Sequence, residues 1–175
     1  MNLFEVIHDA FAPFLDGEKR PLNVLEVSNL WFYLLATELT LRNEEIGYNL
    51  AQDEELKRLI LDTKDNVHIP IRDELRDFLL REGVPLPPST PNKPVGEFRE
   101  IPEGAKLNDE ELVNLMSYNL ASGVAYAARG LTESIRADVG LLFSKFLMKK
   151  NIAGLQVKQY LDQKEWLRIP PYYKP

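Results

Sequence analysis

A proline-rich segment in the middle of the chain limits the possible folds more than any other feature of the sequence. Residues 83–107 hold six of the twelve prolines: Pro85, Pro87, Pro88, Pro91, Pro94 and Pro102. Proline lacks a backbone N–H and fixes φ, so the segment cannot continue a helix and favours an extended conformation. At about 3.1 Å per residue it reaches about 70 Å, whereas a helix of about 30 residues is only about 45 Å long. The segment can therefore cross the full length of a helical domain.

Apolar residues recur at helical spacing on both sides of this segment. Four regions show the pattern, residues 24–48, 53–82, 109–129 and 134–164. Asn23 and Glu26 stand in the relation of a capping box at the start of the first region. Gly47, Gly83 and Gly130 stand where patterns stop, and we predict that they end helices. The short connections within each pair predict two antiparallel hairpins, so we expect an all-α four-helix bundle.

Length, composition and charge narrow the class of protein. A chain of 175 residues fits one domain, with an amphipathic arm at 1–16, the bundle at 24–164 and an aromatic, proline-containing tail at 165–175. The absence of cysteine excludes disulfide scaffolds and thiol catalysis, and it favours a cytoplasmic protein. A net charge of −6 argues against nucleic acid as a partner. The amino terminus does not resemble a secretory signal and no apolar run is long enough for a bilayer, so no membrane partner is expected.

Several motifs together resemble a known family. These are GVPLPP with a second proline cluster, IPEGAKLNDEEL, SIRADVGLLFSKF and EWLRIPP. They are similar to a family of uncharacterised ferritin-like four-helix proteins of spore-forming bacteria, which is related to spore coat protein F. The resemblance covers about residues 20–171. It implies a ferritin-like bundle with one long proline-rich crossover between the second and third helices, and an association with the spore or its coat, but no reaction.

Asp65 and His68 raise the question of a metal site, because they have the spacing of the Glu-x-x-His motif of di-iron bundles. The second helical region has a predicted apolar stripe of Leu56, Ile60, Thr63, Val67, Ile71 and Phe78. At 100° per residue from Val67, His68 lies about 90° and Asp65 about 150° away from this stripe. We therefore predict that His68 lies on the flank of the helix and that Asp65 points into water. Pro70 can kink the helix and so change the direction in which the residues before it point. His8, the other histidine, lies outside the bundle helices.

Glu38 stands in the middle of the apolar stripe of the first helical region. A buried carboxylate must be paired, protonated or bound to metal. We predict a polar network in the core, with Lys149 and Asn119 as the partners of Glu38. Two alternatives stay open: a divergent ferritin-like protein that binds iron or manganese through Glu38, Asp65 and His68 for a redox or storage role, and a small-molecule binder with a cavity around Glu38 and Tyr126.

No phosphate-binding loop, dinucleotide fingerprint or nucleophile elbow is present in the sequence. We therefore expect no catalytic residues, no cofactor and no metal, and a structural or interaction role. Apolar residues also gather outside the four helical regions: Leu3, Phe4, Ile7, Phe11, Phe14, Trp166, Leu167, Ile169, Tyr172 and Tyr173. They either seal the ends of the bundle or contact a partner. From this surplus of apolar surface we predict a homodimer, with spore-coat proteins as further partners.

Overall fold

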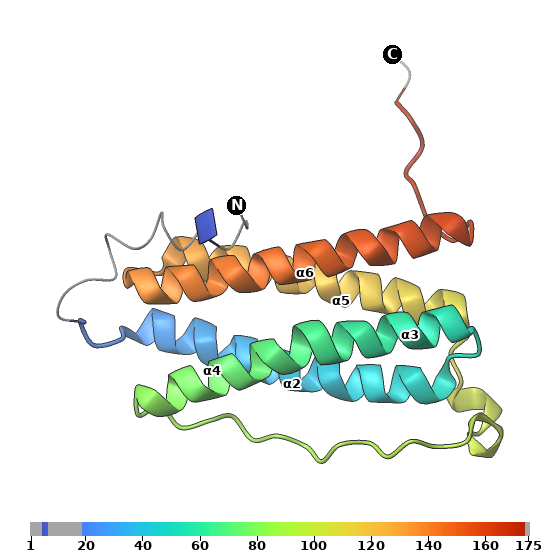
Figure 1. The fold of residues 1–175 in the computed structure, drawn as a ribbon, viewed down its shortest axis with the longest axis horizontal. Coiled ribbons are helices and arrows are strands. Elements are labelled where there is room, and N and C mark those ends of the chain that lie inside the picture. Colours follow the sequence, from blue (N-terminus) through green and yellow to red (C-terminus); the bar gives the residue numbers. More distant parts are fainter. Residues whose placement is uncertain (1–4, 7–18, 174–175) are drawn as a thin grey trace.

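The computed structural model describes residues 5, 6 and 19–173 and shows an all-α four-helix bundle (Figure 1). Its helices are α2 (Val24–Leu50), α3 (Glu54–Thr63), α4 (Ile69–Arg81), α5 (Asp109–Glu133) and α6 (Ala137–Gln163). A π-helical turn, Lys64–His68, joins α3 and α4 into one long rod. The described residues contain no strand, as predicted. Most of the predicted arm at 1–16 lies outside the described residues.

Local sequence signals explain where the helices begin and end. The capping box of Asn23 and Glu26 opens α2 as predicted, and Asn108 and Glu111 form a second one at α5. Gly83 ends α4 with a φ of 71°, and Val84 N–H donates to the carbonyl of Leu79 over 2.9 Å.

The prediction that Gly47 and Gly130 end helices is wrong, because both lie inside helices, α2 and α5. At Gly130 the reason for glycine is close packing. A Cβ there would lie 2.5 Å from Cζ of Phe143, whose ring is fully buried. The glycine therefore lets α5 and α6 approach each other closely.

The π-helical turn sets the orientation of the residues before Pro70. Its hydrogen bond runs from Ile69 N–H to the carbonyl of Lys64, five residues back. Proline cannot donate to the carbonyl four residues before it and its ring crowds that carbonyl, so a wider turn relieves the conflict. The extra residue in the turn rotates His68 toward the bundle interior, while all six predicted stripe positions of the second helical region are buried.

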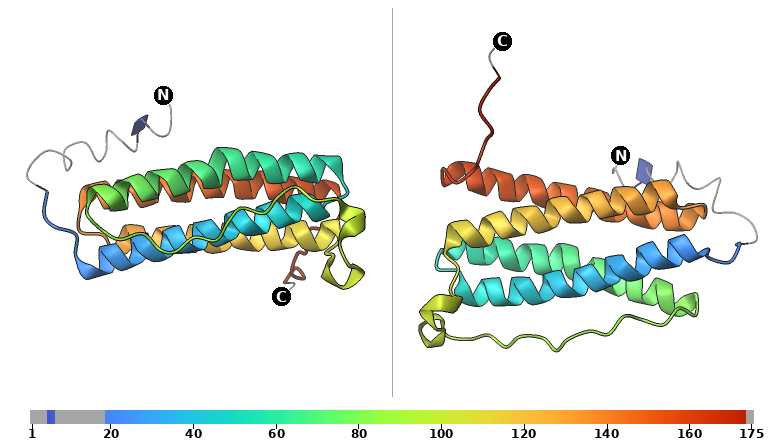
Figure 2. Two further views of the ribbon diagram at one scale, coloured as in Figure 1. Left: turned by 90° about the horizontal axis from the view of Figure 1, so that it is seen from below. Right: turned by 180° about the vertical axis from the view of Figure 1, so that it is seen from behind.

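The proline-rich segment runs alongside α2 between the end of α4 and the start of α5 (Figures 1 and 2). It contains only two short 3-10 turns, Phe98–Glu100 and Glu103–Ala105. Three side chains of α2 donate to its carbonyls: Trp31 to Pro85, Arg42 to Thr90 and Asn49 to Pro94, over 2.8–3.1 Å. These hydrogen bonds attach the extended segment to α2, and the segment is not part of a β-sheet.

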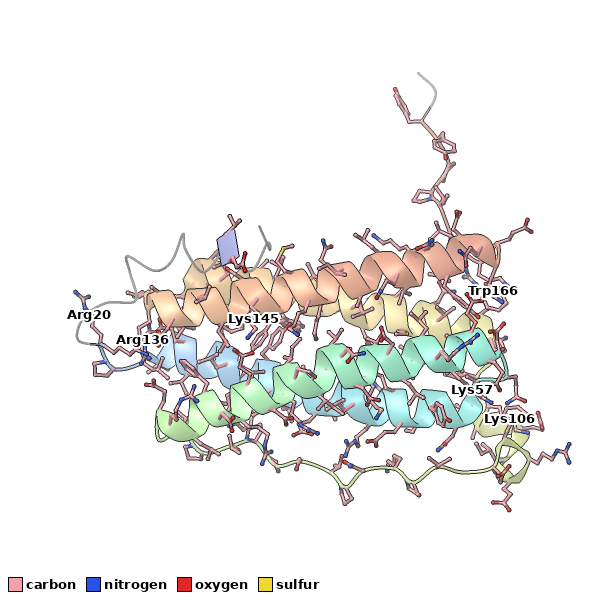
Figure 3. The ribbon with its side chains drawn as sticks, in the orientation of Figure 1. Arg20, Lys57, Lys106, Arg136, Lys145 and Trp166 are labelled. Atoms are coloured by element: carbon pink, nitrogen blue, oxygen red, sulfur yellow. The ribbon has the colours of Figure 1, made fainter. Side chains whose placement is uncertain are left out.

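The end of the bundle where α5 turns into α6 is held by two charged residues. Glu26 is 1% exposed and its Oε1 accepts from the backbone N–H groups of Ile135 and Arg136 over 2.8 and 2.7 Å. Arg136, labelled in Figure 3, donates to both carboxylate oxygens of Glu82 and to Asp138. These contacts tie the α5–α6 connection to α2 and α4.

The carboxyl-terminal tail divides into a packed and an exposed part. Trp166 lies edge-on to Tyr160 with ring centroids 6.2 Å apart, and Leu167 packs against the core. Ile169, Tyr172 and Tyr173 are exposed. Within the described residues 165–173, the start of the tail closes the end of its own bundle.

No helix in the described part of the chain is long and apolar enough to cross a membrane.

Candidate functional site

A buried carboxylate–histidine pair lies in the middle of the bundle. Nδ1 of His68 is 2.6 Å from Oε1 of Glu44, and the side chains are 1% and 6% exposed. Because a carboxylate only accepts, we assign the proton to Nδ1, which donates to Glu44. Burial lowers the pKa of His68, and the hydrogen bond to Glu44 only partly opposes this effect. The histidine is therefore neutral at pH 7.

A buried lysine from α6 adds a positive charge to the same region. Lys150 is 4% exposed, and its Nζ lies 4.9 Å from the ring centroid of Tyr33. Burial lowers the pKa of Lys150 to about 8, with the charge of Glu44 acting in the opposite direction. The side chain fits because α5 carries Gly123 opposite it, where a Cβ would come within 2.6 Å of Cδ and Nζ of Lys150. At pH 7 the ammonium form of Lys150 prevails over its neutral form.

The structure corrects two predictions about these polar groups. His68 is buried and not on the flank of its helix, because the π-helical turn rotates it inward. Glu38 is buried as predicted, but its partner is Arg76 at 3.5 Å, and not Lys149 or Asn119. The reason is that Glu38 faces α4 and not α5 or α6.

Asp65 lies as predicted, with its side chain 53% exposed and paired with Lys64 at 2.6 Å. The three residues named as alternative metal ligands, Glu38, Asp65 and His68, are therefore not brought together, since each has a different partner. The residues at 5, 6 and 19–173 include no group of three or more His, Asp or Glu side chains that is placed to hold a metal ion.

A small recess between α2 and α5 reaches the Glu44–His68 pair. Its volume is about 30 Å³, enough for a water molecule or two. Leu112, Leu115 and Met116 form its apolar wall. Oε2 of Glu44 and Nε2 of His68 are buried and have no hydrogen-bond partner within the described chain. The recess could not take a ligand of drug size without movement of the helices.

The predicted cavity around Glu38 and Tyr126 does not form. Tyr126 is 59% exposed and lines a different groove on the outside of α2 and α5, together with Phe32 and Leu39. Glu38 does not line that groove. The small-molecule alternative thus loses the pair of residues on which it was based.

Sequence reasoning missed Glu44 and Lys150, the two charged groups nearest to His68. The apolar pattern of the first helical region predicts Glu38 as its buried acid, and the predicted partner from the fourth region is Lys149, the neighbour of Lys150. One signal was available: Gly123 lies inside a helix, where glycine is unfavourable unless close packing requires it, which indicates a close neighbour opposite.

The fold and the polar groups in its core place this chain in the class of all-α four-helix bundle proteins. Residues 13–175 match the family described as "Protein of unknown function (DUF3231)", so the chain belongs to that family.

Two relatives cover nearly the whole chain. The first is an uncharacterised protein, YvdQ, from Bacillus subtilis strain 168. It is 28% identical over 156 residues, which are 89% of this chain and 91% of the relative. The second is a crystal structure from Bacillus halodurans, described as a "putative spore coat protein". It is 32% identical with a TM-score of 0.85, over 89% of this chain and 98% of the other.

A conserved hypothetical protein from Mycobacterium tuberculosis has the same fold. Its crystal structure matches with a TM-score of 0.66 at 15% identity, over 80% of this chain and 99% of the other. At this identity the likeness concerns the fold alone.

Proposed function

We propose that this protein is a non-catalytic structural or interaction protein that associates with the bacterial spore or its coat. The main support for the spore is the similarity to the Bacillus halodurans protein described as a "putative spore coat protein", which extends over 98% of that chain. The protein would be made in the cytoplasm of the sporulating cell and would bind other coat proteins. Neither nucleic acid nor a membrane is a proposed partner.

One observation supports a structural role for the polar core. Lys150 carries a positive charge in the interior of the bundle near Glu44 and His68; its charge lowers the pKa of His68, and the charge of Glu44 raises the pKa of Lys150. A divalent cation would have to enter beside this ammonium with only one carboxylate at the pair to balance it. A di-metal site in a helical bundle normally draws several carboxylates from all four helices. The arrangement of charges therefore favours a core without iron or manganese.

The arrangement of the chain supports a finer proposal about the fold. Two helical hairpins, α2 with the α3–α4 rod and α5 with α6, are joined by the proline-rich segment. We propose that the bundle is ferritin-like, with this segment as its one long crossover. The protein would then share an architecture with metal-binding bundles while it uses the core for stability.

Metal binding remains the second candidate because of one specific observation. Glu44 and His68 form a buried pair in which Oε2 and Nε2 each lack a partner in the described chain. Carboxylate oxygens and imidazole nitrogens bind iron and manganese. In this alternative Glu44, and not Asp65, would act together with His68.

The spore association is tested by locating the protein during sporulation. A fluorescent fusion expressed from its own promoter in the bacterium that encodes it should form a ring or cap on the developing spore. Antibody against the untagged protein should then detect it in extracts of purified spores. A fusion that stays evenly distributed in the mother cell, with no protein in washed spores, would contradict the proposal.

A further inference from the structure

One face of the bundle, formed by α2 and α5, has an unusual lack of charge. Residues 112–128 on α5 include no Asp, Glu, Lys or Arg, and neither do residues 27–37 on α2, although 27% of the whole chain is charged. The cores of protein interfaces are depleted in charge and enriched in aromatic residues. This composition, on helices that lie side by side at the back of the bundle (Figure 2, right), indicates a buried surface.

The exposed apolar residues of α2 have a regular spacing. Leu25, Phe32, Leu39 and Ile46 follow one another at intervals of seven and are 43%, 60%, 53% and 43% exposed. A seven-residue interval keeps side chains on one stripe of a helix, and such a stripe is suited to packing against another helix. The stripe is distinct from the side of α2 that holds the proline-rich segment through Trp31, Arg42 and Asn49.

The neighbouring helix α5 continues this surface. Leu115, Tyr118 and Tyr126 are 41%, 70% and 59% exposed. Tyr126 lines a groove of about 420 Å³ together with Phe32 and Leu39, so the two stripes meet along the line where α2 and α5 touch. Arg129 at the end of this groove is already paired with Glu133 at 3.0 Å. The groove, whose lining also includes Ser28 and Asn29, therefore offers a hollow of mixed polarity for a large side chain and no free charge for an ionic partner.

We infer that this α2/α5 face, residues 25–46 of α2 with 115–126 of α5, binds the same face of a second copy of the chain. The inference rests on the proposed interaction role and names the surface of the homodimer. A partner for this face should present apolar and aromatic side chains to its two stripes, and the chain carries such a surface itself. Two-fold pairing of identical faces is the commonest way to bury one.

The size of the face is sufficient for a stable dimer. The stripe from residue 25 to 46 is about 32 Å long, the stripe from 115 to 126 is about 17 Å long, and each helix is about 10 Å wide. Each copy thus contributes about 500 Å², and two facing copies bury about 1,000 Å², the area that a biological interface should reach. Phe32 and Tyr126 of one copy would fill the groove of the other, as aromatic residues do at interface centres.

Light scattering during size-exclusion chromatography tests this inference on the full chain at tens of micromolar. The wild-type protein should have twice the mass of one chain. Leu39→Glu and Phe32→Glu should raise the dissociation constant by about a hundredfold or more, because each buries an unpaired charge. Leu155→Glu is the matched control, since Leu155 on α6 is 58% exposed and lies outside the face. Circular dichroism of each variant checks that it is folded.

A second measurement keeps the test independent of stability. Because the chain has no cysteine, single cysteines can be placed at Leu39 or Leu155 and treated with a short flexible bis-maleimide. Leu39→Cys should give covalent dimers and Leu155→Cys should not. A monomeric wild-type protein would overturn the inference, and so would a dimer that resists both glutamate substitutions and cross-links at Leu155→Cys. A monomer that still locates to the spore would contradict this inference alone.

Discussion

His68 donates from Nδ1 to Oε1 of Glu44 over 2.6 Å, and both side chains are almost completely buried. This pair depends on the π-helical turn before Pro70, which rotates His68 into the core. Together with Lys150 from α6, Glu44 and His68 bring ionisable groups from three helical segments into the interior of the bundle. The free energy of unfolding should therefore depend on pH through these buried groups.

The lowered pKa of His68 predicts a loss of stability in acid. Above the unfolded pKa of about 6.5, the histidine is neutral in both states and its contribution is constant. As the pH falls below about 6.5, the unfolded state takes up a proton that the buried residue does not. The free energy of unfolding then falls, by at most about 1.4 kcal/mol per pH unit. Urea denaturation of wild type and His68→Gln at pH 7.5 and 5.5 measures this, and an equal loss in both proteins would contradict it.

The lowered pKa of Lys150 predicts a change in the free energy of unfolding at alkaline pH. Its pKa is about 8 in the folded state and 10.5 as the ordinary value. Between these values the unfolded state keeps a proton that the folded state has lost, so stability rises with pH, by about 1 kcal/mol per unit. The difference between wild type and Lys150→Met should show this rise, whereas Lys145→Met should not, because Lys145 is 37% exposed and paired with Glu74. A flat difference for Lys150→Met would show that the lysine titrates normally.

Glu26 should contribute more to the free energy of unfolding than an ordinary capping-box glutamate does. Glu26→Ala leaves the buried N–H of Arg136 and the partly buried N–H of Ile135 without their acceptor and should cost about 2–3 kcal/mol, since a buried unsatisfied donor costs about 1–3 kcal/mol and a more exposed one costs less. Glu111 is the control, because it occupies the same position in the α5 capping box. Glu111→Ala should cost about 1 kcal/mol. Equal losses in chemical denaturation would mean that Glu26 does not hold the α5–α6 connection.

Two glycine substitutions should have opposite effects. Gly130→Ala places a methyl group 2.5 Å from the buried ring of Phe143 and should destabilise the protein by about 1–3 kcal/mol. Gly154→Ala on α6 meets nothing within 4 Å and should stabilise it by about 0.5–1 kcal/mol, because alanine favours the helix. Thermal unfolding of the two variants compares these effects. Stabilisation by Gly130→Ala would show that α5 and α6 are not closely packed there.

Most of the architecture could be predicted from the sequence, because its signals are local. Helical spacing and the capping box at Asn23 identified the helices, with ends that shift by a few residues. Gly83 was a correct stop signal, and Gly130 was not, since close packing and positive φ both select glycine. Only the structure separates these two reasons.

The polar core was harder to predict because it depends on helix phase. An ideal helix placed His68 about 90° from the apolar stripe, and the π-helical turn removes that offset. Pro70 indicated where the direction of the side chains around the helix axis could change, but it did not indicate toward which side. The partners of Glu38 and His68 come from other helices, and the rotation of those helices is a tertiary property that one sequence does not reveal.

A metal analysis of protein purified without chelators tests most directly the proposal that the core is structural. With Lys150 charged beside Glu44 and His68, we predict well under one equivalent of iron, manganese or zinc per chain. Glu44→Gln and His68→Gln should then leave the metal content unchanged while they lower the stability. Stoichiometric metal that disappears in both variants, with Asp65→Asn as an unaffected control, would contradict the structural role and establish a metal site.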